Sequence, residues 1–246
     1  MPKGDVLEEV PVLGPLWRAG SRPVGSVRAV ATPRRAVVLT FDDGPLVGST
    51  EGVLAALADG GATATFFVLM TRVRAAPRLL EQIVAAGHEV ALHGEDHVRL
   101  TSMPTRQVVE RTRRAKQELE QLVGRPVRWV RPPYGSQTPR TWAALRRAGM
   151  TPVMWGATTS DWRDQPTAER LRGALAHLRP GQIVLAHDAI AGVADGAEER
   201  EPFELDRGRF TRELLAEYAG RGFTAVSLAD ALADGGRLRR WAWFGR

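Results

Sequence analysis

The sequence predicts a single-domain α/β protein, a distorted (β/α) barrel of about seven strands, for three reasons. Strand-like and helix-like segments alternate along most of the chain, which favours a parallel sheet with helices outside it. The length of 246 residues suits one α/β barrel, since such barrels typically have about 250 residues. Polar residues follow several of the expected strands, at the end where α/β folds place their sites. An open doubly wound sheet is the alternative topology.

The expected strands are short apolar runs. Residues 36–41, AVVLTF, form a nearly continuous run, which is typical of a strand buried on both faces. A second run, ATATFFVL, occupies residues 62–69. Five more strands are expected at residues 89–93, 127–131, 151–156, 182–187 and 223–226.

Helices are expected between these strands, where apolar residues recur with helical spacing. Several of the segments end at a glycine, as helices commonly do. The longest is an amphipathic helix at residues 105–123, which stops at Gly124. The others are expected at residues 50–59, 78–86, 139–148, 167–178 and 210–219, with a short helix after Ser227.

We divide the chain into an irregular N-terminal segment at residues 1–34, a main domain at 35–236 and a basic aromatic tail at 237–246. The tail reads RLRRWAWFGR, so it either packs across the bottom of the barrel or makes a weak membrane-surface contact. The acid-rich stretch 188–207 starts at a strand end. We expect this loop to border or cover the cleft and to limit access by large or anionic substrates. The alternative is a disordered surface loop that points away from the cleft.

Composition and the missing motifs narrow the possible metal ligands, partners and location. The sequence has no cysteine, so any metal must be held by His, Asp or Glu. The net charge of +6 is spread over expected helices, which indicates solvated faces, with weak affinity for anionic polymers as the alternative. No nucleic-acid-binding motif is recognisable, so we expect no nucleic-acid partner. No apolar run has the roughly 18 residues of a spanning helix, and the first 20 residues lack a signal-peptide core, so we expect a cytoplasmic location.

Two clusters have the chemistry of a metal site. Asp42 and Asp43 follow the first buried strand, and the Gly-Pro turn after them would let both carboxylates face one pocket. A plain Asp-Gly turn is the alternative. His93 and His97 follow the third strand four residues apart, a spacing that places two imidazoles on one face of a helical turn. A solvated pair is the alternative.

A third cluster, RPPYG at residues 131–135, combines a cation with a stiff loop. Besides Arg131, it offers free backbone N–H groups at Tyr134 and Gly135, and such groups can stabilise a developing oxyanion. The alternative is a rigid loop with a surface arginine.

The last two clusters follow later strands. Asp161 and Trp162 place a carboxylate beside an indole, which suits a sugar-binding cleft; a buried indole with a capping Asp is the alternative. His187 ends the apolar run 182–187. A lone histidine there is more often structural, but it shares the strand-end rim with the other clusters.

Taken in order, these motifs resemble the polysaccharide deacetylase family, the NodB-homology domain of carbohydrate esterase family four. The resemblance rests on FDDGP, His-x-x-x-His, RPPYG, Asp-Trp and Leu-x-His, and on the connecting text ATFFV and GHEV. It covers residues 35–233, about four-fifths of the chain.

The resemblance implies a role for each motif. Asp43, His93 and His97 would bind one divalent metal, usually Zn²⁺, with Co²⁺ or Ni²⁺ as alternatives. Asp42 would be the general base that activates a metal-bound water, and Arg131 would orient it.

The remaining motifs would act on the substrate. The Tyr134 N–H would hold the oxyanion, and His187 would be the general acid, fixed and charged by Asp161. Trp162 and Pro133 would line the cleft.

Two positions depart from the family pattern. Gly94 stands where the family usually has Ser or Thr, and Thr158 stands where it usually has an acid. A hydroxyl that supports the metal site and one charge near the acid are therefore absent.

The implied function is a metal-dependent hydrolase that removes an N- or O-acyl group from an amino sugar, in a polysaccharide or a small glycoside. Two alternatives stay open: a non-catalytic carbohydrate-binding protein on the same fold, and a deacylase of a non-sugar small amide.

Overall fold

The computed structural model describes residues 25–245. The expectations for residues 1–24 therefore lie outside the described residues. The strands are β1 (Ser26–Ala31), β2 (Ala36–Asp42), β3 (Thr65–Leu69), β4 (Glu89–Gly94), β5 (Trp129–Val130), β6 (Thr151–Pro152), β7 (Ala157–Thr158), β8 (Ile183–His187), β9 (Thr224–Val226) and β10 (Arg237–Trp241). The helices are α2 (Thr50–Asp59), α3 (Met70–Ala75), α4 (Pro77–Ala85), α5 (Thr105–Val123), α6 (Pro139–Arg147), α7 (Thr167–Leu175), α8 (Arg207–Gly220) and α9 (Leu228–Ala233).

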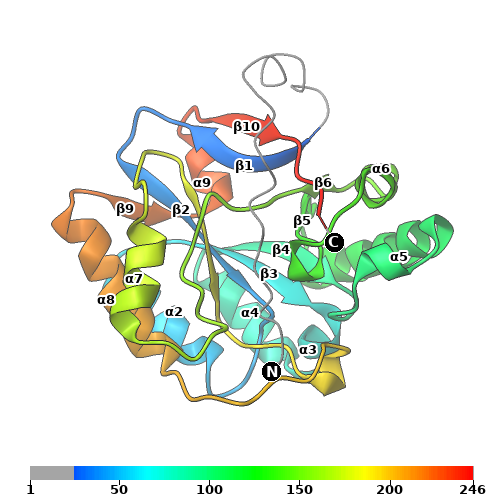
Figure 1. Ribbon diagram of the computed structural model, residues 1–246, viewed down its shortest axis with the longest axis horizontal. Coiled ribbons are helices and arrows are strands. Elements are labelled where there is room, and N and C mark those ends of the chain that lie inside the picture. Colours follow the sequence, from blue (N-terminus) through cyan, green and yellow to red (C-terminus); the bar gives the residue numbers. More distant parts are fainter. Residues whose placement is uncertain (1–24, 246) are drawn as a thin grey trace, which may run out of the picture.

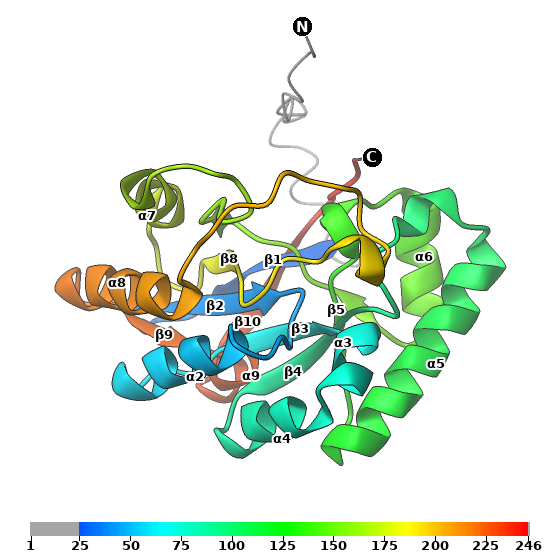
Figure 2. The same cartoon turned by 90° about the horizontal axis from the view of Figure 1, so that it is seen from below.

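One curled parallel sheet carries the fold. Its strands follow the order β6-β5-β4-β3-β2-β8-β7, and β9 pairs with the first half of β2. The helices α2, α4, α5 and α8 lie outside the sheet, as Figures 1 and 2 show. The predicted α/β class and the distorted barrel of about seven strands are confirmed.

A small antiparallel sheet closes the open side of the barrel. β1 pairs with β10, from Ser26 opposite Trp241 to Ala31 opposite Arg237. β1 also bridges to Val153, which follows β6, and to Gln182, which precedes β8. The two-stranded sheet therefore joins the two sides of the barrel opening.

Three expectations differ from this structure. The segment up to residue 34 contains a regular strand, β1, and the first half of the basic tail is β10. The single strand expected at residues 151–156 is wrong: β6 and β7 lie at opposite edges of the sheet, because the chain between them crosses to β1 through Met154 N–H and Val27 C=O (2.7 Å).

The central strand β2 shows how the core positions the site. All seven of its residues are buried, as its apolar run predicts. Val37, Leu39 and Phe41 pack into the helix-covered core, whereas Val38 packs into a second core inside the barrel. Because side chains alternate along a strand, Thr40 and Asp42 share the inner face with Val38.

Within residues 25–245, no helix has the length and apolar character needed to cross a membrane.

Candidate active site

The structure brings Asp43, His93 and His97 together at the carboxyl ends of β2 and β4. We call these three residues the Asp-His-His cluster. One ligand atom from each residue lies within 4.8 Å of the others, and all three residues are buried. Asp43 Oδ1 is 3.2 Å from His93 Nε2 and 3.4 Å from His97 Nε2.

The protonation pattern of the cluster fits a bound cation. His93 Nδ1 lies 2.9 Å from the Arg131 carbonyl, which can only accept, so this nitrogen is the one that carries the proton when the imidazole is neutral. Its Nε2 then offers a lone pair toward Asp43 Oδ1, which has no hydrogen-bond partner among the described residues. Lone pairs that face one another in a buried space repel, and a metal ion bound between them would turn this repulsion into attraction.

The pKa values of the cluster agree with this arrangement. Burial lowers the pKa of His97 to about 4, so the ring is neutral near pH 7. Burial alone would raise the pKa of Asp43, but the close contact with His93 and the electrostatic influence of His97 and His187 hold it well below its usual value. One carboxylate and two neutral imidazoles form a standard donor set for Zn²⁺.

The turn that carries Asp43 is fixed from the loop after β8. Asp43 has a left-handed backbone (φ 75°), and its Oδ2 accepts a hydrogen bond from Ala191 N–H (2.9 Å). The next residue, Gly44, donates to Asp188 Oδ1 (3.1 Å). A Cβ at Gly44 would lie 1.9 Å from Asp188 Oδ2, so only glycine fits there.

Asp42 forms a buried ion pair with Arg131. Arg131 Nη1 donates to Asp42 Oδ1 (2.6 Å) and to Thr40 Oγ1 (3.0 Å). Arg131 is fully buried, and its guanidinium lies 4.1 Å from the centre of the Phe67 ring. Arg131 thus fixes the orientation of the Asp42 carboxylate, which lies beside the Asp-His-His cluster but is not one of its three members.

The RPPYG loop differs in one detail from the expectation. Tyr134 has a left-handed backbone (φ 62°), and its ring stands edge-on to His97 at 4.3 Å. The Gly135 N–H was expected to be free, but it donates to the Pro132 carbonyl (2.9 Å). Tyr134 N–H therefore remains as the candidate donor to an oxyanion, and Pro133 is buried.

His187 and Asp161 form a second buried pair of ionisable side chains. His187 Nδ1 lies 2.7 Å from Asp161 Oδ1, and His187 backbone N–H donates to Asp161 Oδ2 (2.8 Å). Burial opposes the charged imidazole, yet the Asp161 carboxylate raises the pKa of His187 above its usual value. Trp162 stands edge-on to the imidazole at 5.3 Å, half-buried at the rim.

Arg207 is a site residue that the sequence did not reveal. It is the first residue of α8, and its Nη1 donates to Asp161 Oδ2 (2.9 Å) and to the His187 carbonyl (3.0 Å). The only local signal was a cation at the end of an acidic loop, which equally fits a solvated surface. Thr158, at the position of the usual family acid, caps a turn instead: its Oγ1 accepts from Ser160 N–H (3.1 Å).

The backbone conformation at position 94 explains why a glycine stands there. Its φ is +150°, and a Cβ there would lie 2.7 Å from the Asp96 carbonyl oxygen. The chain between His93 and His97 therefore turns more tightly than a Ser or Thr at this position would allow.

The loop at residues 188–207 borders the site. Besides the contact to Asp43, its Asp195 carbonyl accepts from His97 N–H (2.7 Å), and its Glu198 N–H donates to Tyr134 Oη (2.9 Å). Asp195 also forms a buried ion pair with Arg72 of α3 (2.8 Å). Figure 2 shows this loop, yellow to orange, crossing from β8 to the side of α3 and back to α8.

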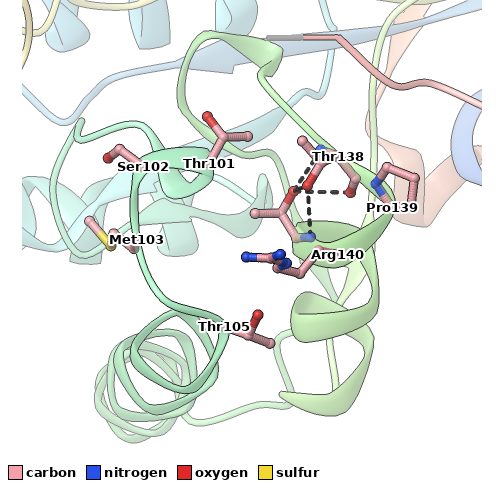
Figure 3. A pocket seen from close by; sticks show the side chains of 8 residues that line it. Thr101, Ser102, Met103, Thr105, Thr138, Pro139 and Arg140 are labelled. Atoms are coloured by element: carbon pink, nitrogen blue, oxygen red, sulfur yellow. Dashed lines mark hydrogen bonds between the residues drawn. The ribbon is translucent and has the colours of Figure 1, made fainter.

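A separate hollow of about 630 Å³ lies between the starts of α5 and α6 (Figure 3). None of the predicted site residues line it. Its walls are Thr101, Ser102, Met103, Thr105, Thr138, Pro139, Arg140 and Thr141. Arg140 is the one ionisable residue among these walls, so the hollow lacks the cluster of ionisable groups found at the strand ends.

Known proteins are similar to this chain in sequence and in fold. A sequence profile described as polysaccharide deacetylase matches residues 29–153. The chain is 38% identical over 182 residues to a chitooligosaccharide deacetylase from Bradyrhizobium sp. (strain ANU 289), a match that covers 73% of this chain and 81% of the relative.

Solved structures of the same family are also similar to this chain. A family 4 carbohydrate esterase from Streptomyces lividans in complex with acetate is 28% identical, with a TM-score of 0.66, and the match covers 77% of this chain and 91% of that one. A family pseudoenzyme, BA3943 from Bacillus anthracis, shows the fold alone at 21% identity, with a TM-score of 0.68 and coverage of 83% and 68%. The chain belongs to the polysaccharide deacetylase family, the NodB-homology hydrolases that act on the amide bonds of acetylated sugars.

Proposed function

We propose that this protein removes the acetyl group from N-acetylated amino sugars of the chitooligosaccharide type, with Zn²⁺ held by the Asp-His-His cluster. The observation that carries the proposal is the presence of two oriented proton-transfer groups beside that cluster, Asp42 on Arg131 and His187 on Asp161. The substrate class follows the Bradyrhizobium relative, which is a chitooligosaccharide deacetylase. A polysaccharide, a small glycoside and an O-acetyl ester remain alternatives within the same chemistry.

A bound divalent ion would supply Lewis-acid chemistry, which acidifies water and polarises the acyl carbonyl. The cluster fits such an ion because its three ligand atoms face one another, and Asp43 Oδ1 receives no hydrogen bond from the described residues. Zn²⁺ suits one carboxylate and two imidazoles, with Co²⁺ and Ni²⁺ as alternatives.

The residues of the chain would move the protons. Asp42, held by Arg131, accepts a proton from the attacking water, whose oxygen forms the new bond to the acyl carbon. Tyr134 N–H donates to the carbonyl oxygen as negative charge develops there. His187 gives its proton to the sugar nitrogen as the carbon–nitrogen bond breaks, so that the products are acetate and a free amine.

A non-catalytic carbohydrate-binding protein is the second candidate, because a pseudoenzyme shares the fold and Thr158 replaces a usual acid. Two observations weigh against it. Both Asp42 and His187 are present, and each is hydrogen bonded to the partner that its role requires.

The test is acetate release from purified protein. Substrates would include chitooligosaccharides of several lengths, N-acetylglucosamine, a small glycoside, an acetylated ester and a non-sugar acetamide. The protein would be assayed after chelation and after addition of Zn²⁺, Co²⁺ or Ni²⁺. We expect metal-dependent release from the oligosaccharides; binding without release under every metal would favour the non-catalytic candidate, and release from the acetamide alone would favour the small-amide deacylase.

A variant separates the acid from the other groups. His187→Ala should slow hydrolysis of the amide more than that of an activated ester, because only the amine leaving group needs a proton. An equal loss on both substrates would contradict the role of His187.

Two other expectations stay predictions. A cytoplasmic location can be checked by cell fractionation. A weak membrane-surface contact of the C-terminal tail can be checked by co-sedimentation with anionic vesicles.

A further inference from the structure

The residues after β10 contact the loop that carries Tyr134. Trp243 Nε1 donates a hydrogen bond to the Gly135 carbonyl (2.9 Å). Two residues further along the chain, Gly245 exchanges both backbone hydrogen bonds with Gln137, each at 2.9 Å. The end of the chain is therefore paired with residues 135–137.

The Trp243 side chain is held in place for this contact. The centre of its ring lies 5.1 Å from the centre of the Trp155 ring. The guanidinium of Arg28, a residue of β1, lies 4.6 Å from the centre of the Trp243 ring. The Trp243 carbonyl accepts from Gln137 Nε2 (2.8 Å). An aromatic ring fixed by packing, with its N–H aimed at one acceptor, can impose a geometry on that acceptor.

The loop has a conformation that needs such support. Tyr134 and Gly135 both have φ 62°, and a left-handed backbone is unfavourable for a residue with a side chain such as Tyr134. Such a residue keeps this conformation when the surrounding structure over-determines it. Gly135 is fixed on both sides, since its N–H donates to Pro132 and its carbonyl accepts from Trp243.

The space beside the Gly135 Cα is also filled. A Cβ at this position would lie 2.5 Å from the Trp155 ring, so the loop rests directly on that indole. Trp155 in turn packs against Trp243. The two tryptophans therefore hold the loop by contact and by a directed hydrogen bond.

We infer that Trp243 is a positioning residue for deacetylation: through the Gly135 carbonyl, the C-terminal segment holds the Tyr134 N–H in the direction needed to stabilise the oxyanion. The inference rests on the proposed function. It assigns the segment at residues 243–245 a part in the reaction that a solvent-exposed tail would not have. The physical reason is that a donor helps only when it is aimed at the charge that develops.

The experiment compares Trp243→Phe, Trp243→Ala and the control Trp241→Phe in the zinc-loaded full chain. Trp243→Phe keeps an aromatic ring against Trp155 but removes the N–H donor. Trp241 lies in the same segment, and among the described residues its indole N–H donates no hydrogen bond. We expect kcat on a chitooligosaccharide to fall about tenfold in Trp243→Phe and further in Trp243→Ala, less than the roughly hundredfold or greater loss when an oxyanion donor itself is removed.

KM, zinc content and thermal unfolding midpoint should stay unchanged in Trp243→Phe, and Trp241→Phe should match the wild type. Faster hydrogen exchange over residues 132–137 in Trp243→Phe, but not in Trp241→Phe, would support the same conclusion without an activity measurement. The inference is overturned if kcat of Trp243→Phe equals that of the wild type, or if kcat falls only together with zinc content or stability. Wild-type protein that releases no acetate would instead refute the proposed function.

Discussion

Arg207 Nη1 lies 2.9 Å from Asp161 Oδ2, and both side chains are buried. The other oxygen of this carboxylate faces His187, so Asp161 is shared between two cations when the imidazole is protonated. A buried carboxylate is costly unless its oxygens are satisfied. Arg207 provides part of that satisfaction in a chain where Thr158 has replaced a second acid.

Removal of Arg207 should therefore destabilise the protein and impair His187 as the general acid. We expect Arg207→Gln to lower the free energy of unfolding by about 3 kcal/mol, because breaking one side of a buried ion pair typically costs 3–5 kcal/mol. We also expect kcat to fall at least tenfold as Asp161 loses its fixed position. Urea unfolding and acetate release would measure both effects.

The matched control is Arg209→Gln, two residues further along α8, whose partner Glu213 is an exposed i,i+4 pair. Such pairs contribute about 0.3–0.5 kcal/mol, so little should change. Partial recovery in Arg207→Lys would indicate that the charge matters. Equal stability and kcat in Arg207→Gln and Arg209→Gln would contradict the role of Arg207.

The pH dependence should reveal the influence of Asp161. The negative charge of Asp161 raises the pKa of His187, and catalysis needs the protonated imidazole, so activity is lost as pH rises through that raised pKa. In Asp161→Asn the charge is gone and burial still disfavours the imidazolium. The alkaline limb of kcat/KM should then move to lower pH, whereas the exposed control Asp164→Asn should leave it in place. A limb that stays unchanged in Asp161→Asn would show that another group controls it.

Metal binding and catalysis should separate by residue. His93→Ala and His97→Ala should lose bound metal and activity together, because each removes a donor from the Asp-His-His cluster. Asp42→Asn should keep the metal and lose turnover, since Asp42 contacts Arg131 instead. Metal analysis beside acetate release measures this, and full occupancy in both histidine variants would refute the site.

Restoring the usual family residue at position 94 should harm this protein. In Gly94→Ser the new Cβ would meet the Asp96 carbonyl at 2.7 Å, in a backbone conformation that side chains rarely adopt. We expect a loss of about 1–3 kcal/mol in stability, typical of strained positions, and weaker zinc binding because His93 and His97 flank this turn. Thermal unfolding and zinc titration would test this; tighter zinc binding in Gly94→Ser would show that the missing hydroxyl matters more than the backbone.

Much of the fold could be predicted because its signals are local. The buried run of β2 and the periodic helix α5 depend on neighbouring residues, and the helix was predicted at the bounds it has. β1 and β10 were missed because each is stabilised by the other, more than 200 residues away. α3 was missed because Met70–Ala75 follows β3 directly, with no turn or loop residue between the two elements to mark where the helix begins.

The site shows the same division. Asp42, Asp43, His93 and His97 lie in compact motifs at strand ends, so their types and spacing indicated a site. Arg207 and Trp243 act through single long-range contacts, to Asp161 and to Gly135. No local pattern distinguishes such an arginine or tryptophan from one on the surface.

The last prediction concerns the loop at residues 188–207 and access to the cleft. Its buried contacts to Asp43 and His97 frame the site, so replacing the whole loop would damage the metal ligands as well. Glu198 offers a narrower test. Its carboxylate pairs with Arg99 at 2.9 Å in an exposed position, and Arg99 covers the Tyr134 ring at 3.9 Å.

Glu198→Ala removes this pair but keeps the backbone N–H that donates to Tyr134 Oη. Stability should change by less than about 1 kcal/mol, as for other exposed ion pairs. If the Arg99–Glu198 pair restricts the cleft, kcat/KM should rise for long oligosaccharides relative to short ones, and Glu199→Ala should not reproduce the change. A constant ratio across substrate lengths would mean that the loop frames the site without limiting access to it.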